Sequence, residues 1–132
     1  MGVRMKGDDI AKRLRRLAGQ VIKLCRTLPR DSTCRHVALQ LVRAVSGGGS
    51  NYEEARGAES RADFIHKLSI ATKELRESLY WLELAKEAEL FTADIEPLVC
   101  EANELVAILT SSIKTAKLHA LQARAPSYPA RQ

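Results

Sequence analysis

The sequence predicts an all-α protein, an antiparallel up-down-up-down four-helix bundle. Leu, Ala, Glu, Lys and Arg dominate the 132 residues and aromatic residues make up only 5%, a composition typical of helices. Long stretches contain neither Gly nor Pro. Within them, apolar residues recur at steps of three and four, which is the spacing of one helix face. Because the helices are joined by short connections, we expect consecutive helices to pack against each other in one domain.

The first helix is predicted from about Asp8 to Leu28. Asp8 and Asp9 are placed to cap its start and to oppose its dipole. Pro29 ends the helix, because proline cannot continue a helical hydrogen-bond pattern. An unbroken apolar seam runs through Ile10, Leu14, Leu17, Val21, Leu24 and Leu28.

The second helix is predicted to begin near residue 32, with Asp31 or Ser32 as its cap. Its stripe consists of Cys34, Ala38, Leu41, Val45, Gly48, Tyr52 and Ala55. Residues 46–50, Ser-Gly-Gly-Gly-Ser, are linker-like, since each glycine costs a helix about 1 kcal/mol relative to alanine. A flexible break and a continuous helix with close packing are both compatible with this segment. The preserved register favours the continuous helix.

The third helix follows a turn near residues 56–60, where Ser60 and Asp63 resemble a capping box. Its core stripe is Phe64, Leu68, Ala71, Leu75, Leu79, Leu82 and Ala85. The fourth helix starts at residues 93–95, with Asp94 as a candidate cap and Pro97 in its first turn, and continues to about Leu121. The predicted organisation is a flexible leader at 1–7, the bundle at 8–121 and a disordered tail at 122–132.

Helices three and four carry more apolar residues than one bundle core requires. Ile65, Ile70, Tyr80 and Trp81 widen the third helix's stripe, and Ile108 is among those that widen the fourth. This surplus favours self-association, because monomers rarely expose large apolar patches. The alternative is that the wide stripes surround a thick core.

The positive charge is concentrated at the start of the chain. Residues 1–30 hold nine Lys or Arg and two Asp, an excess of +7, whereas the whole chain carries +5. Six basic residues of the first helix lie off its apolar seam and could follow a phosphate backbone. These candidate nucleic-acid-binding residues are Lys12, Arg13, Arg15, Arg16, Lys23 and Arg26. The alternative is a solvated face that keeps the protein soluble. A membrane surface is a weaker candidate partner, since the helix lacks aromatic anchors.

The sequence contains no arrangement typical of catalysis, of cofactor binding or of a metal site. None of His36, His66 and His119 has a Glu three residues before it, as helical metal sites require. Glu74 and Glu77 could form an acid/base pair, but Lys73 and Arg76 beside them favour a solvated or ion-paired face. We therefore expect no enzyme activity, no cofactor and no metal.

Three cysteines without CxxC spacing indicate buried free thiols rather than disulfides or zinc. Those cysteines are Cys25, Cys34 and Cys100. There is no secretory signal, and no apolar run approaches the roughly 20 residues that span a bilayer. We therefore expect a cytoplasmic protein.

The centre of the chain resembles a known family. The relevant stretches are Arg43-Ala-Val-Ser-Gly-Gly-Gly-Ser-Asn-Tyr-Glu-Glu-Ala55, Glu59-Ser-Arg-Ala-Asp-Phe-Ile-His-Lys-Leu68, and Glu74 through Tyr80-Trp-Leu-Glu-Leu84. They resemble the bacterial four-helix bundle family that includes proteins encoded in intervening sequences of 23S ribosomal RNA genes. The accessory variability proteins of diversity-generating retroelements are similar bundles. The likeness extends from about residue 8 to 118, and Gly47 and Gly48 depart from it, where Ser followed by Val or Ile is expected.

The resemblance implies an antiparallel four-helix protomer, assembled as a homopentameric ring, with a basic surface that touches nucleic acid and no enzyme activity. Together with the charge of the first helix, it predicts a non-enzymatic oligomeric protein that binds RNA or DNA. The alternative is a protein-only scaffold that docks a partner, such as a reverse transcriptase, and binds no nucleic acid.

Overall fold

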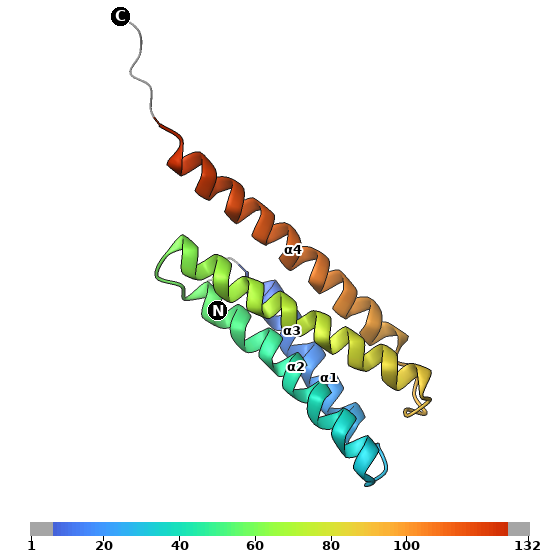
Figure 1. The fold of residues 1–132 in the computed structure, drawn as a ribbon. Coiled ribbons are helices and arrows are strands. Elements are labelled where there is room, and N and C mark those ends of the chain that lie inside the picture. The colour runs from blue at the N-terminus through green and yellow to red at the C-terminus, as the bar shows by residue number, and fades with distance from the viewer. Residues whose placement is uncertain (1–6, 127–132) are drawn as a thin grey trace, which may run out of the picture.

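Four helices account for nearly all of the structure, a computed structural model that describes residues 7–126. They are α1 (Asp8–Cys25), α2 (Ser32–Arg56), α3 (Arg61–Glu87) and α4 (Glu96–Arg124), and no strand occurs within the described residues. The connections α1–α2 and α3–α4 lie at one end of the molecule and α2–α3 at the other (Figure 1). The predicted all-α, four-helix fold is confirmed.

The helix starts depend on local capping. The Asp31 side chain accepts a hydrogen bond of 2.8 Å from the Cys34 amide, and Ser60 accepts one of 3.0 Å from the Asp63 amide. The Ser60 cap was predicted from the sequence, and Asp31 is one of the two residues predicted to cap α2. At α1 the N-cap is instead Gly7, with φ 87° and no side-chain cap bond. Asp8 and Asp9 occupy the first turn, where negative charge is favourable near the positive end of the helix dipole.

Two helix ends differ from their predicted positions. Helix α1 ends at Cys25, before Leu28, because the amides of Thr27 and Leu28 bond to carbonyls only three residues back, which tightens the chain into a turn. At the other end of the chain, α4 continues through Arg124, beyond the expected end at Leu121. Residues 1–6 of the predicted leader (1–7) and residues 127–132 of the predicted tail (122–132) lie outside the described residues.

The core lies between all four helices. Its fully buried side chains include Leu14, Leu17 and Val21 of α1, Leu41 and Val45 of α2, Leu68, Leu75 and Leu82 of α3, and Leu105 and Leu109 of α4. Most of the predicted stripe residues are therefore buried as expected. After Leu109, however, no residue of α4 is buried. The reason is length: α1 has 18 residues and α4 has 29, and α4 extends past α1 (Figure 1). We call residues 114–124 the α4 overhang.

The glycine run lies inside a continuous helix, as the register predicted. Gly48 is buried against α3, and a Cβ at this position would lie 3.1 Å from Cγ and Cδ2 of Leu75. Glycine therefore allows α2 and α3 to approach closely at this level.

The start of α1 is fastened to the end of α2. The Tyr52 hydroxyl donates a hydrogen bond of 3.3 Å to the Gly7 carbonyl, and Arg56 forms an ion pair with Asp8. The hydrogen bond to Asp8 raises the pKa of the Arg56 guanidinium above its ordinary value. These contacts fix where α1, with its basic side chains, lies on α2.

Candidate nucleic-acid interface

Four basic side chains form a row on the outer side of α1 and its C-cap: Lys12, Arg16, Lys23 and Arg26. All four are exposed. Since a helix turns by about 100° per residue, they lie on the side of the helix opposite its buried stripe, which contains Leu14. Within residues 7–126, none of the four takes part in an ion pair. We call these residues the outer row; their charges face solvent and are available to an anionic partner.

The other two predicted residues have carboxylate neighbours. Arg13 pairs with Glu101 and, at 3.1 Å, with Glu104, so it links α1 to α4. The hydrogen bond to Glu101 raises the pKa of the Arg13 guanidinium. The side chain of Arg15 is 74% exposed and lies 3.9 Å from Glu53 on α2, which is a loose contact in high dielectric. The structure thus brings four of the six predicted residues into one row, with Arg15 beside it and Arg13 between helices.

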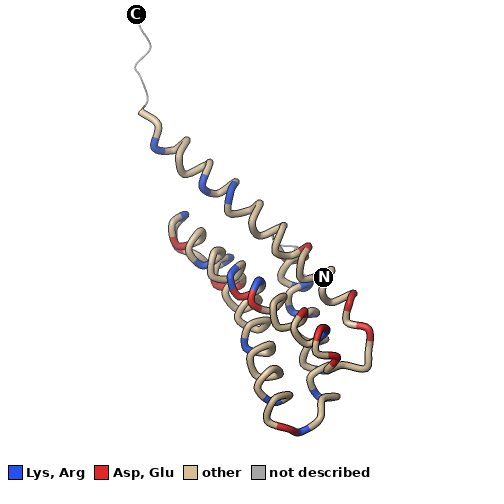
Figure 2. Tube along the Cα trace, turned by 45° about the vertical axis from the view of Figure 1, so that its right-hand side comes forward, with Lys and Arg blue, Asp and Glu red and all other residues tan. Residues whose placement is uncertain are grey.

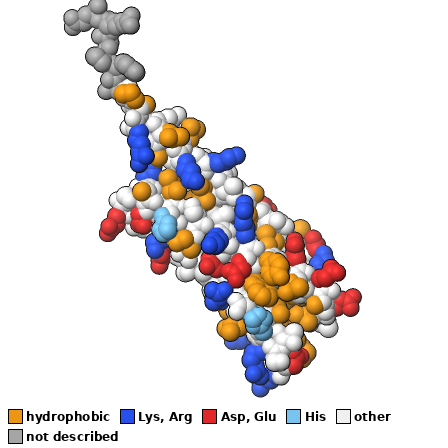
Figure 3. Space-filling view, viewed as in Figure 1, with side chains coloured by type: hydrophobic (Ala, Val, Ile, Leu, Met, Phe, Trp, Pro, Cys, Tyr) orange, Lys and Arg blue, Asp and Glu red, His pale blue; other side chains and the backbone are white. Residues whose placement is uncertain are grey.

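A second exposed surface consists of aromatic and apolar side chains on α2 and α3. Leu39 is 64% exposed, Tyr80 60% and Leu84 36%. The Trp81 ring contacts both Tyr80 and His36 edge-on, with centroid separations of 5.3 and 5.7 Å. Figure 3 shows hydrophobic side chains gathered beside a histidine at the lower end of the face in view. We call Leu39, Tyr80, Trp81 and Leu84 the aromatic patch; its Tyr and Trp are residue types that are enriched at the energetic centres of protein interfaces.

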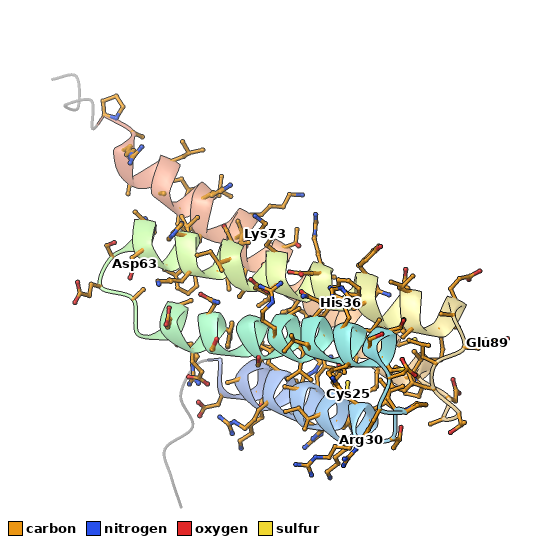
Figure 4. All side chains as sticks on the ribbon, turned by 60° about the horizontal axis from the view of Figure 1, so that its bottom comes forward. Cys25, Arg30, His36, Asp63, Lys73 and Glu89 are labelled. Atoms are coloured by element: carbon orange, nitrogen blue, oxygen red, sulfur yellow. The ribbon has the colours of Figure 1, made fainter. Side chains whose placement is uncertain are left out.

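A groove between α3 and α4 was not foreseen from the sequence. Two adjoining cavities of about 580 and 410 Å³ share Lys117 as a lining residue. Every ionisable side chain that lines them is basic: Arg61, Lys73, Arg76, Lys114, Lys117 and Arg124. Figure 4 labels Lys73 on α3, beside α4. The sequence held one signal for this groove, because basic residues recur three apart on both helices, at 73 and 76 and at 114 and 117.

The two glutamates that were considered as an acid/base pair have different surroundings. Glu77 forms an ion pair of 3.0 Å with Arg43 on α2 and accepts a hydrogen bond of 3.4 Å from the Trp81 ring nitrogen. Glu74 packs against Gly47, and its buried Oε2 has no hydrogen-bond partner within residues 7–126. The expected ion pairing is therefore found at Glu77, and its partner comes from another helix.

The histidines and cysteines are dispersed. His36, His66 and His119 are all exposed, and the described part of the chain holds no cluster of three or more His, Cys, Asp or Glu suited to a metal. Cys34 is buried and Cys25 half-buried, but Cys100 is exposed, so the expectation of three buried thiols is wrong for Cys100. Burial raises the pKa of the Cys25 thiol. Among the described helices, none combines the length and apolar character that crossing a membrane requires.

Comparison with known proteins identifies the family. The model of the 23S rRNA-intervening sequence protein family matches residues 7–111. The chain belongs to this family. The match covers α1, α2, α3 and the first half of α4, and it ends before the basic residues of the α4 overhang.

A solved structure supports membership in the 23S rRNA-intervening sequence protein family. It is the crystal structure of a protein of unknown function from the S23 ribosomal protein family, from Bacteroides thetaiotaomicron VPI-5482. The two chains are 34% identical, with a TM-score of 0.75, over 83% of this chain and 99% of that one. No curated protein matches the chain. The fold and the family are therefore shown.

Proposed function

We propose that this protein is a non-enzymatic, homo-oligomeric nucleic-acid-binding protein of the cytoplasm. Antiparallel four-helix protomers assemble into a five-fold ring, and each contributes its outer row. One observation carries the proposal: Lys12, Arg16, Lys23 and Arg26 are exposed along one side of α1, without a carboxylate partner among the described residues. Lys and Arg that meet phosphates release condensed counterions, which favours binding independently of sequence.

The aromatic patch supports the oligomeric part of the proposal. Leu39, Tyr80 and Leu84 are exposed and Trp81 is half-buried, and contiguous exposed apolar surface is typical of protein interfaces and unusual on monomers. A ring would present several outer rows at once, so that one nucleic acid could contact more than one protomer and bind more tightly than to a single row.

The proposal predicts a specific effect of neutralising the outer row. The triple variant Lys12→Gln, Arg16→Gln, Lys23→Gln should keep its fold, since all three side chains are exposed and unpaired within residues 7–126. Its affinity for duplex DNA and single-stranded RNA should fall. For duplex DNA, the slope of log affinity against log salt should decrease by about one for each lost phosphate contact. Fluorescence anisotropy titrations at several salt concentrations measure both quantities.

The matched control removes the same charge elsewhere. Arg43, Lys67 and Lys86 each form an ion pair on another part of the surface, so their triple Gln variant should bind nucleic acid almost as well as the parent. If the two triple variants lose affinity equally, net charge rather than the outer row governs binding. If the parent binds neither nucleic acid at low salt, the protein-only scaffold becomes the better proposal, with the aromatic patch as its docking surface.

A further inference from the structure

The α3–α4 groove continues for about four helical turns, from Arg61 to Arg76 along α3. Its other wall includes most of the α4 overhang, where α4 has no α1 beside it. The floor at the overhang end is aliphatic: Ala62, Ile65, Ala120, Leu121 and Ala123. Leu121 itself is 67% exposed. In a helical bundle, such a groove between two helices is the place that a third helix occupies.

The charges around the groove have one sign. All six ionisable lining residues are basic, and none of them forms an ion pair within residues 7–126. The helix that supplies one wall is itself divided: Glu96, Glu101 and Glu104 precede Lys114, Lys117 and Arg124. Figure 2 shows this separation along α4, with basic residues toward its C-terminal end. The groove therefore favours an anionic occupant.

The aliphatic floor of the groove restricts which kind of anionic molecule can bind there. No aromatic side chain lines either cavity, so nucleic-acid bases would have no ring to stack on, and a phosphate backbone would leave the aliphatic floor uncovered. The chain's own terminal segments do not fit either, because residues 1–6 and 127–132 contain basic but no acidic residues. An amphipathic helix with carboxylates beside its apolar stripe would satisfy both the floor and the rim.

We propose that the α3–α4 groove binds an acidic amphipathic helix of a partner protein. The apolar stripe of that helix covers Ile65 and Leu121, and its carboxylates meet Lys73, Lys114 and Lys117. Most of the α4 wall lies beyond residue 111, where the family match ends, whereas the α3 wall lies within the matched segment. It uses none of the outer-row residues and does not depend on nucleic-acid binding.

The probe is a labelled synthetic helix of about four turns, with Leu at three- and four-residue steps and Glu flanking the stripe. Two control peptides are used. The first has the same composition in scrambled order, and the second has the same apolar stripe flanked by Lys instead of Glu. In anisotropy titrations, the acidic amphipathic peptide should bind at least about tenfold more tightly than either control, a difference of about 1.4 kcal/mol. The variant Lys114→Gln, Lys117→Gln should bind it about tenfold more weakly than the parent protein.

Two further variants test the floor. Leu121→Gln should weaken peptide binding several-fold, whereas Leu118→Gln should not, because Leu118 is on the same helix and 55% exposed but lines neither cavity. The outer-row triple variant should bind the peptide like the parent, and the Lys114/Lys117 variant should still bind nucleic acid. This separates the failure of one proposal from the failure of the other.

Three results would overturn the inference. Equal binding of the scrambled peptide would make the groove a general polyanion surface. Displacement of the peptide by single-stranded RNA of the same charge at an equal concentration would assign the groove to nucleic acid. A lower assembly mass for Leu121→Gln in light scattering would show that a second copy of the chain covers the floor.

Discussion

Glu74 and Gly47 meet where α2 and α3 approach each other. A Cβ at position 47 would lie 3.3 Å from Cγ, Cδ and Oε2 of Glu74, closer than an ordinary van der Waals contact. At the same time Oε2 is buried without a hydrogen-bond donor among residues 7–126. A buried carboxylate oxygen that lacks a hydrogen-bond donor lowers the free energy of unfolding. The missing hydrogen-bond donor therefore affects stability at this position more than the tight fit does.

This contact predicts the order of stability of two substitutions at position 47. Gly47→Ala gains up to about 1 kcal/mol of helix propensity but adds a methyl group in a tight place, so its net gain should be smaller. Gly47→Ser also supplies a hydroxyl that can donate to Oε2, a bond to a charged group worth about 1.5–3 kcal/mol. Urea unfolding at a fixed protein concentration should rank serine above alanine. A serine variant less stable than the alanine variant would contradict this account of Glu74.

Single residues also mark what the sequence could and could not predict. The Asp31 and Ser60 caps accept hydrogen bonds from amides only three residues away, so the local sequence is sufficient to indicate them. The pairing of Arg13 with Glu101 joins residues 88 positions apart. It depends on how α1 is rotated against α4, which periodicity alone does not give. For that reason the sequence alone places Arg13 among the six candidate nucleic-acid-binding residues.

At the scale of helices, two glycines have opposite surroundings. A Cβ at Gly19 on α1 would meet nothing within 4 Å, whereas one at Gly48 on α2 would meet Leu75 at 3.1 Å. Gly19→Ala should therefore stabilise the protein by about 1 kcal/mol through helix propensity. Gly48→Ala should destabilise it by about 1–3 kcal/mol, because overpacking forces α2 and α3 apart.

Urea midpoints of the two alanine variants, compared with the parent, test this pair directly. Circular dichroism provides the control that both variants remain helical. A Gly48→Ala variant more stable than the parent would mean that the close approach of α2 and α3 is not required. A Gly19→Ala variant with reduced stability would place position 19 in a contact that lies outside one protomer.

The helices themselves were largely predictable, because their apolar stripes repeat over many turns. The register through Gly48 correctly predicted that α2 is continuous despite three glycines in succession. The groove was not predictable in the same way. Lys73 and Lys114 come close to a common cavity only because α3 and α4 pack side by side, and a helix-by-helix reading treats each as an ordinary surface lysine.

For the whole molecule, we predict a homo-oligomer in solution. The aromatic patch leaves Leu39 and Tyr80 more than half exposed, and covering them in an interface is favourable by about 25 cal/mol per Å² of apolar surface. Multi-angle light scattering at micromolar concentration should give a mass near five times the 14.6 kDa of the chain. A stable species of 14.6 kDa would contradict this prediction.

A double variant tests whether the aromatic patch forms the contact between protomers. Leu39→Gln with Tyr80→Gln changes two exposed side chains, so the protomer should fold while the assembly dissociates. Lys67→Gln with Lys86→Gln is a suitable control, since it alters charge on other parts of the surface. An unchanged mass for the first variant would place the interface elsewhere on the protomer.

The α4 overhang has a consequence for hydrogen exchange. None of its residues is buried, and it lies at the end of α4, so its hydrogen bonds can open from the helix end without disturbing the core. Local opening there should therefore cost far less than opening of the core, and deuterium should enter residues 114–124 well before it enters the Leu105–Leu109 turn. A helix bound in the α3–α4 groove should slow this uptake. The exchange rate of the overhang thus reports whether the groove is occupied, even for a partner whose identity is unknown.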